Sequence, residues 1–195
     1  MPDCHIWEGK PLDIRIKRKK RLINILLYSV AVFYILLLLL ILFRQRHAVR
    51  SVNLIPLRGI TAFLTGKDLV TGSMENAWFI RGFALSNILG NIVIFVPLGV
   101  YLTLFHKDKA VWKNTLWVVL ASVAAEAAQF AFKMGIGDID DVILNGLGGL
   151  LGVLLCRGIY RVCKNEDFKA RCVVAVMAPL VGMLCFGILL IMNYT

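Results

Sequence analysis

Polar side chains able to do chemistry are concentrated between residues 126 and 152 of the chain. They occupy one apolar segment, the turn that follows it and the start of the next apolar segment: Glu126, Gln129, Asp138, Asp140, Asp141 and Asn145. Ionisable groups at membrane depth are costly, so they usually face a protein interior or a wet cavity. A carboxyl group held there is a candidate general acid or base. This stretch therefore predicts a polar site.

Three polar residues earlier in the chain extend the predicted site, namely Arg58, Asn87 and Asn91. We assign three acids as candidate catalytic residues, with Glu126 as the acid or base and Asp140 and Asp141 as ligands of a cation or polar headgroup. The candidate substrate-binding residues are Arg58, which would bind an anionic group, Asn87, Asn91, Gln129, Asp138 and Asn145.

Each of these residues also has a purely structural interpretation. Aspartate is a favoured N-cap and suits the first turn of a helix, so capping accounts for one or two of the three aspartates in residues 138–141. The asparagines would be interhelical hydrogen-bonding groups. Glu126 would pair with Lys133 or Arg58. The sequence leaves both interpretations open.

Four carboxylates near one turn are also oxygen ligands of the kind that Mg²⁺ and Ca²⁺ prefer. Their spacing is not that of an EF-hand, and neither the five cysteines nor the three histidines have zinc spacing. We predict no cofactor and leave a divalent cation open. A proton relay would need carboxylates at intervals across the bilayer, and Glu126 stands alone inside the apolar segments.

Hydrophobic residues make up 59% of the 195 residues, and the mean hydropathy is +0.77. Soluble domains are closer to half apolar, with charge interleaved. Here the charges are confined to gaps between long apolar runs, which indicates a membrane protein. The net charge is +10, and the basic residues that produce it lie beside those runs. Their position favours membrane lipids as partners and argues against nucleic acid.

Five apolar runs are long enough to span a bilayer: residues 22–43, 87–105, 115–132, 142–160 and 172–192. We predict an all-α, polytopic membrane helical bundle with five transmembrane helices. We divide the chain into three regions: a cytoplasmic basic tail at 1–21, a membrane domain at 22–160, and a cytoplasmic loop plus C-terminal transmembrane helix at 161–195. Pro97 predicts a kink in the second run. Gly148-x-x-x-Gly152 predicts the close approach of another helix in the fourth.

A long connection, residues 44–86, joins the first two predicted spans. Pro56 and several glycines argue against one continuous helix there. Residues 60–64 and 77–85 are apolar enough to lie in the membrane interface. A loop of this length is usually functional or disordered, and this one is too apolar for disorder.

Basic residues set the predicted orientation. The N-terminal tail and residues 106–114 and 157–171 are rich in Lys and Arg, whereas the turn 133–141 holds one Lys and three Asp. We therefore place the N-terminus in the cytoplasm and the C-terminus outside, because basic residues of a long loop, such as those in 44–86, weigh less. The polar ends of spans two to four then meet the long connection in one outward-facing pocket.

Three segments of the chain resemble a known family, and all three hold candidate site residues or their neighbours. They are Asn53-Leu54-Ile55-Pro56-Leu57, the stretch from Asn87 to Gly99, and the stretch from Glu126 through Asp138 and Asn145 to Gly149. Over residues 22–160 they resemble the VanZ-like family, small bacterial membrane proteins named after a teicoplanin-resistance protein. The recurrent polar residues of that family fall on Asn91, Glu126, Gln129, Asp138, Asp140, Asp141 and Asn145. Gly146 departs from the pattern, since many relatives have Thr there.

The resemblance implies a multi-pass protein of the bacterial plasma membrane, linked to low-level glycopeptide resistance. The leading hypothesis is a cell-envelope protein that acts at the outer leaflet on a lipid, a cell-wall precursor or a lipid-tailed antibiotic. One rival hypothesis is a non-catalytic binding or assembly partner of another envelope protein. Another is a chain whose acids only stabilise the fold. Catalysis and oligomeric state stay open at this point.

Overall fold

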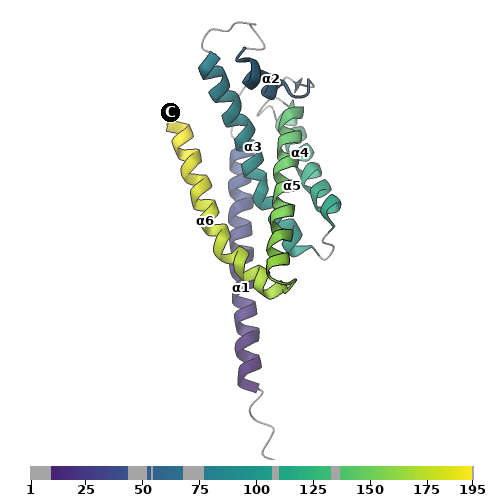
Figure 1. Ribbon diagram of the computed structural model, residues 1–195, viewed down its shortest axis with the longest axis vertical. Coiled ribbons are helices and arrows are strands. Elements are labelled where there is room, and N and C mark those ends of the chain that lie inside the picture. Colours follow the sequence, from purple (N-terminus) through teal and green to yellow (C-terminus); the bar gives the residue numbers. More distant parts are fainter. Residues whose placement is uncertain are drawn as a thin grey trace, which may run out of the picture. The chain divides into compact units, whose positions relative to one another are not determined.

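The computed structural model describes residues 10–43, 52–53, 55–67, 77–106, 110–132 and 137–194. Within them the chain forms six helices: α1 (Lys10–Leu42), α2 (Arg58–Thr65), α3 (Ala77–Phe105), α4 (Val111–Ala131), α5 (Ile139–Val162) and α6 (Asp167–Tyr194) (Figure 1). Two short strands, β1 (Val52–Asn53) and β2 (Gly137–Asp138), pair with each other. The chain divides into two compact units, one within residues 1–35 and 159–195 and the other within residues 36–158.

Three of the described helices are long and apolar enough to cross a membrane: α1 from Ile14, α3 and α5. A membrane-spanning helix satisfies its own backbone hydrogen bonds, which is why apolar runs of this length fold as helices in lipid. The all-α class is therefore confirmed, with three helices that are candidates for membrane spans. The count of five transmembrane helices stays a prediction, because α4 and α6 match predicted spans but are not among these three.

Two helix boundaries differ from the prediction. The first helix begins at Lys10 rather than at residue 22, so the basic block of the expected tail lies on α1. Lys and Arg are good helix formers, and nothing in the block interrupts the helix. Likewise, residues 77–85 form the first turns of α3 rather than a separate segment, and their place in the membrane interface stays a prediction. Pro97 lies inside α3, and the kink predicted there stays a prediction.

The unit within residues 1–35 and 159–195 is joined by a polar cluster at the start of α6. The Tyr160 hydroxyl of α5 donates a hydrogen bond to Asp167 at 2.6 Å. The guanidinium of Arg171 donates to Asp167 at 2.7 Å and to Asn24 of α1 at 3.1 Å. Asp167 lies in the first turn of α6, where a negative charge suits the helix dipole. Residues from α1, α5 and α6 are therefore joined in one cluster through Asp167 and Arg171.

In the unit within residues 36–158, α3 and α5 touch backbone to backbone through glycines. A Cβ atom added to Gly148 would lie 2.1 Å from the carbonyl oxygen of Ile92, and one added to Gly152 would lie 2.0 Å from that of Val96. A Cβ on Gly99 of α3 would lie 2.1 Å from the carbonyl oxygen of Gly149. Only glycine allows these distances. The close approach predicted from the Gly-x-x-x-Gly spacing is confirmed.

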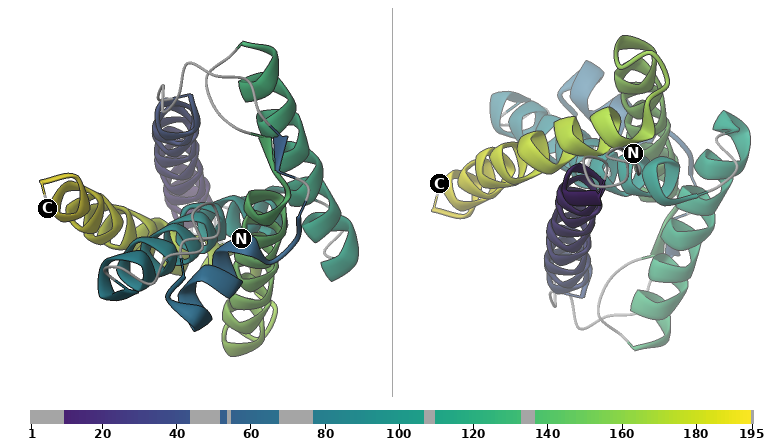
Figure 2. Two further views of the ribbon diagram at one scale, coloured as in Figure 1. Left: turned by 90° about the horizontal axis from the view of Figure 1, so that it is seen from above. Right: turned by 90° about the horizontal axis from the view of Figure 1, so that it is seen from below.

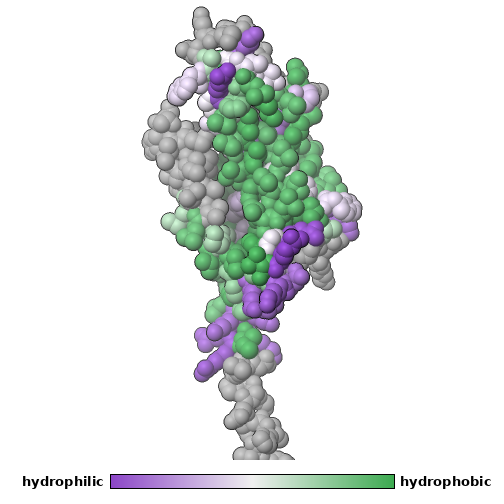
Figure 3. Space-filling model, viewed as in Figure 1, coloured by the Kyte–Doolittle hydropathy of each residue, from purple (hydrophilic) through white to green (hydrophobic). Residues whose placement is uncertain are grey.

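The α4 helix packs against the same pair, since a Cβ on Gly149 of α5 would lie 2.3 Å from the side chain of Val118. Figure 2 shows α3, α4 and α5 as neighbours from both ends. The core between them holds Phe95, Leu104, Val118 and Val153, all nearly inaccessible to solvent. The outer side of α5 carries exposed leucines at helical spacing, and Figure 3 shows an extensive hydrophobic face on these helices. Such a face suits a lipid environment.

Candidate functional site

A two-residue parallel ladder brings the connection that precedes α2 next to the turn that precedes α5. Val52 is opposite Gly137, and Asn53 is opposite Asp138. Strands this short contribute little stability alone. Their position in the chain determines which segments meet at the site, because β1 leads into α2 and β2 leads into α5. The segments before both helices are thereby held next to each other.

Asp140 caps the N-terminus of α2, although it belongs to the first turn of α5. One carboxylate oxygen accepts a hydrogen bond from the backbone N–H of Leu57 at 2.5 Å, and the other accepts one from Gly59 at 2.8 Å. Leu57 is the N-cap residue of α2, has a left-handed φ of 65°, and supplies no side-chain cap. Helix N-termini bind anions, and here a buried carboxylate, 6% exposed, fills that role.

Asp138 and Glu126 continue this network towards α4. The N–H of Asp140 donates to Asp138 Oδ1 at 2.9 Å, so Asp138 caps the start of α5 as an aspartate in that position should. The N–H of Asp138 in turn donates to Glu126 Oε2 at 3.1 Å. Glu126 is only 9% exposed. A carboxylate from the last turns of α4 is thus joined, through Asp138, to the aspartate that caps α2.

Asp141 connects α5 with α3. The side-chain amide of Asn91 donates a hydrogen bond to its carboxylate. Asn87 lies one turn before Asn91 on α3, is half-buried, and makes no hydrogen bond with the described residues. The structure therefore brings Asn91 to Asp141 and shows no hydrogen bond of Asn87 with an acid among the described residues. Arg58 begins α2 next to Leu57, and the described part of the chain does not include its side chain.

Asn145 and Gln129 make contacts away from the four acids. Asn145 is 1% exposed, and its amide donates to the Ser122 hydroxyl of α4 at 2.8 Å. The Asn145 carbonyl oxygen is buried and has no hydrogen-bond partner among the described residues. Gln129 donates to the carbonyl oxygen of Leu42, at the end of α1, at 2.5 Å. Gln129 thus satisfies a helix-end carbonyl.

The chemistry available at this site follows from these partners. Three of the acids, Glu126, Asp138 and Asp140, are linked in series by backbone N–H groups, and Asp141 is bonded separately to the Asn91 amide. Among the described residues, no three His, Cys, Asp or Glu side chains are grouped as metal ligands. The residues present can accept hydrogen bonds from hydroxyl and amide groups, and Glu126 can exchange a proton if a substrate reaches it.

Sequence reasoning missed Ser122 and the backbone of Leu57 and Gly59. Ser122 is four residues before Glu126, so it shares a helical face with that acid, and this spacing was the available signal. The backbone donors have no side-chain signature. Only the position of Gly59, shortly after Pro56 at the start of a short apolar segment, pointed to a helix N-terminus.

The Asn145–Ser122 hydrogen bond is expected to couple the two residues energetically. We expect a double-mutant cycle of Asn145→Ala and Ser122→Ala to give a coupling energy of about 0.6 kcal/mol, the average for interhelical hydrogen bonds in a membrane protein. The measurement is the free energy of unfolding in mixed micelles. Pairing Ser122→Ala with Asn114→Ala, two turns away on α4, is the additive control. Equal coupling in both cycles would rule out a direct Asn145–Ser122 interaction.

Comparisons with known proteins found two matches to this chain. A model of the VanZ/LLP1 family matches residues 25–162, from α1 to the end of α5. Protein VanZ of Enterococcus faecium is 32% identical over 108 residues, which is 55% of this chain and 66% of that protein, just under two thirds of its length. No solved structure matches the chain. Together with the three apolar helices, the match indicates a bacterial membrane protein. The chain belongs to the VanZ/LLP1 family.

Proposed function

We propose that this protein lies in the bacterial cell envelope and contributes to resistance against glycopeptides, in particular teicoplanin. Its polar site would act on, or bind, a lipid, a cell-wall precursor or a lipid-tailed antibiotic at the outer leaflet. The similarity to Protein VanZ supports the resistance role. The network that joins Glu126 of α4 to Asp138, Asp140 and the start of α2 is the observation that supports a site.

Capping alone accounts for only part of this network. Asp138 caps α5 and Asp140 caps α2, as expected of aspartates at helix N-termini. Glu126 lies in the last turns of α4 and caps neither of these helices. Burying a carboxylate there is costly unless hydrogen bonds compensate for the lost hydration, and such carboxylates commonly have a functional role. We therefore place the chemistry, if the site is catalytic, at Glu126, with Asp140 and Asp141 holding the polar part of the substrate.

In our proposal, the orientation of the chain across the membrane places this site at the outer leaflet. The basic block on α1 and the basic residues between α5 and α6 favour the cytoplasm for those ends. The N-terminal end of α5 carries Asp140 and Asp141 and is the opposite end of that helix. A protein with this orientation presents the acids to the compartment where wall precursors and glycopeptides meet.

Replacing Glu126 with Gln is expected to abolish teicoplanin resistance without loss of protein. A glutamine oxygen can still accept the hydrogen bond from the Asp138 N–H, but the side chain can no longer transfer a proton. General acid–base groups contribute about 10²- to 10⁴-fold to rates, so the susceptibility of cells should return to that of the empty vector. The measurement is teicoplanin susceptibility beside the amount of tagged protein in membranes.

Two further variants complete this test. Glu126→Asp keeps an acid and should retain part of the resistance, whereas Glu126→Ala should lower protein level and resistance together if the role is structural. Full resistance in Glu126→Gln would remove this residue from the mechanism.

A non-catalytic role as binding or assembly partner is the second candidate. Its support is that Asp138, Asp140 and Asp141 all contact protein groups, while α4 and α5 expose a broad apolar face. Crosslinking in cells followed by mass spectrometry separates the candidates. A stoichiometric envelope partner, together with resistance that survives loss of Glu126, would favour this second function.

A further inference from the structure

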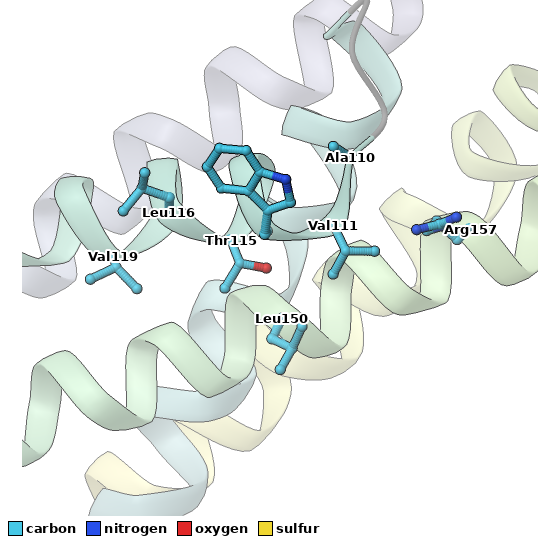
Figure 4. A pocket seen from close by; sticks show the side chains of 8 residues that line it. Ala110, Val111, Thr115, Leu116, Val119, Leu150 and Arg157 are labelled. Carbon is cyan, nitrogen blue, oxygen red and sulfur yellow. The ribbon is translucent and has the colours of Figure 1, made fainter.

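An open groove of about 760 Å³ runs between α4 and α5. Val111, Trp112, Leu116 and Val119 line it from α4, and Leu150 and Arg157 line it from α5. Figure 4 shows Val111 and Leu150 in the space between the two helices, with Arg157 towards one end.

Arg157 gives this apolar groove one charged end. Its side chain is exposed and makes no hydrogen bond or ion pair within the described residues. It lies seven residues beyond Leu150, about 10 Å along the helix. A second cation is nearby, because Lys113 Nζ lies 5.5 Å from the centre of the Trp112 ring. The groove therefore combines an apolar body with a cationic end, which is complementary to a lipid with an anionic headgroup.

Thr115 adds an unused hydrogen-bond donor to the same groove. The other threonines that the structure describes, Thr61, Thr65 and Thr103, each donate to the carbonyl oxygen four residues earlier. Thr115 lines the groove, and its hydroxyl oxygen, which neighbouring protein atoms shield from solvent, has no hydrogen-bond partner in the described residues. A polar group left unpaired at membrane depth is costly. An ester carbonyl of a bound lipid would be a suitable acceptor.

We propose that this groove holds one anionic phospholipid. Its phosphate pairs with Arg157, an acyl chain lies against the apolar wall formed by Val111, Leu116 and Leu150, and an ester carbonyl accepts the hydrogen bond of Thr115. Thr115 is eleven residues before Glu126, about 16 Å along α4, so this site is separate from the acid network and independent of the function proposed for it. In the predicted orientation it faces the cytoplasmic leaflet, where anionic lipids attract basic residues.

Quenching of Trp112 by brominated lipids tests the proposal. Full-length protein with Trp7, Trp78 and Trp117 changed to Phe, so that Trp112 is the single tryptophan, is reconstituted in phosphatidylcholine bilayers. Brominated phosphatidylglycerol or brominated phosphatidylcholine is then titrated in. We expect phosphatidylglycerol to be preferred about fivefold, the affinity equivalent of one cation near an anionic lipid. A protein that retains Trp78 alone, at the start of α3, should show no preference.

Substitutions assign the preference to the groove. Arg157→Gln should remove it, whereas Arg157→Lys and Arg161→Gln should retain it, since Arg161 lies one turn further along α5 and does not line the groove. Thr115→Val should weaken quenching by both brominated lipids, because both carry ester carbonyls. Two results would overturn the proposal. One is equal quenching by the two lipids in the protein that retains Arg157, and the other is a preference for phosphatidylglycerol that survives Arg157→Gln. Unchanged quenching in Thr115→Val would remove the threonine from it.

Discussion

Replacing Gly152 with alanine is expected to remove most of the folded protein. The added Cβ would lie 2.0 Å from the Val96 carbonyl oxygen and 3.0 Å from the Val100 nitrogen, so the backbones of α3 and α5 would have to separate. Overpacking usually costs about 1–3 kcal/mol, and a clash with the backbone of a neighbouring helix, which cannot rotate away as a side chain can, belongs at the upper end of that range. The measurement is the thermal unfolding midpoint in detergent, together with the protein level in membranes.

Gly158 provides the matched control, since it lies on the same helix and a Cβ there would meet nothing within 4 Å. Gly158→Ala should leave the midpoint unchanged or raise it, because alanine is the better helix former by about 1 kcal/mol. Gly148→Ala should behave like Gly152→Ala. If alanine at 152 and at 158 had equal effects, the backbone contact of α3 with α5 would not hold the unit together.

Replacing Asp140 with alanine is expected to release α2 from the rest of its unit. The change removes both acceptors of the Leu57 and Gly59 N–H groups, and hydrogen bonds to charged groups contribute about 1.5–3 kcal/mol each. Leu57 would then lose the contact that holds its left-handed backbone in place. Hydrogen exchange measured by mass spectrometry should show much faster exchange in residues 57–65, while α3 and α5 stay protected.

Two controls accompany this experiment. Asp140→Asn keeps one acceptor oxygen and should give intermediate exchange. Glu166→Gln removes an exposed acid that pairs only locally with Lys169, and it should leave the exchange of α2 unchanged. Slow exchange of α2 in Asp140→Ala would show that other contacts position this helix.

Hydropathy predicted where the long helices lie, but it did not predict all of their ends. The end of α3 at Phe105 was predicted, because charged residues follow it directly. The start of α3 at Ala77 was not, since a helix that already satisfies its backbone can continue past the apolar run that suggested it. The same reason explains the start of α1 at Lys10. Composition marks what enters lipid, whereas helix ends depend on caps and local backbone contacts.

The candidate site was predicted as a group of residues rather than as a set of contacts. Topology alone indicated that Glu126 and the aspartates of 138–141 would share one region, and they do. Their partners could not be predicted, because Asp140 binds backbone groups from a distant segment. Gln129 shares a helical face with Glu126 in the sequence pattern. An offset of three residues rotates it by about 60°, however, and the structure uses it to contact α1.

The distance in sequence between Asp140 and its partners has a consequence for biosynthesis. Leu57 and Gly59 precede Asp140 by 83 and 81 residues, and α3 and α4 lie between them. A growing chain must therefore deliver both intervening helices before the capping carboxylate leaves the ribosome. Until then the segment before α2 has neither its cap nor its partner strand. The site therefore cannot form before α3 and α4 have been made, and a nascent chain arrested before residue 140 would contain α2 without its cap.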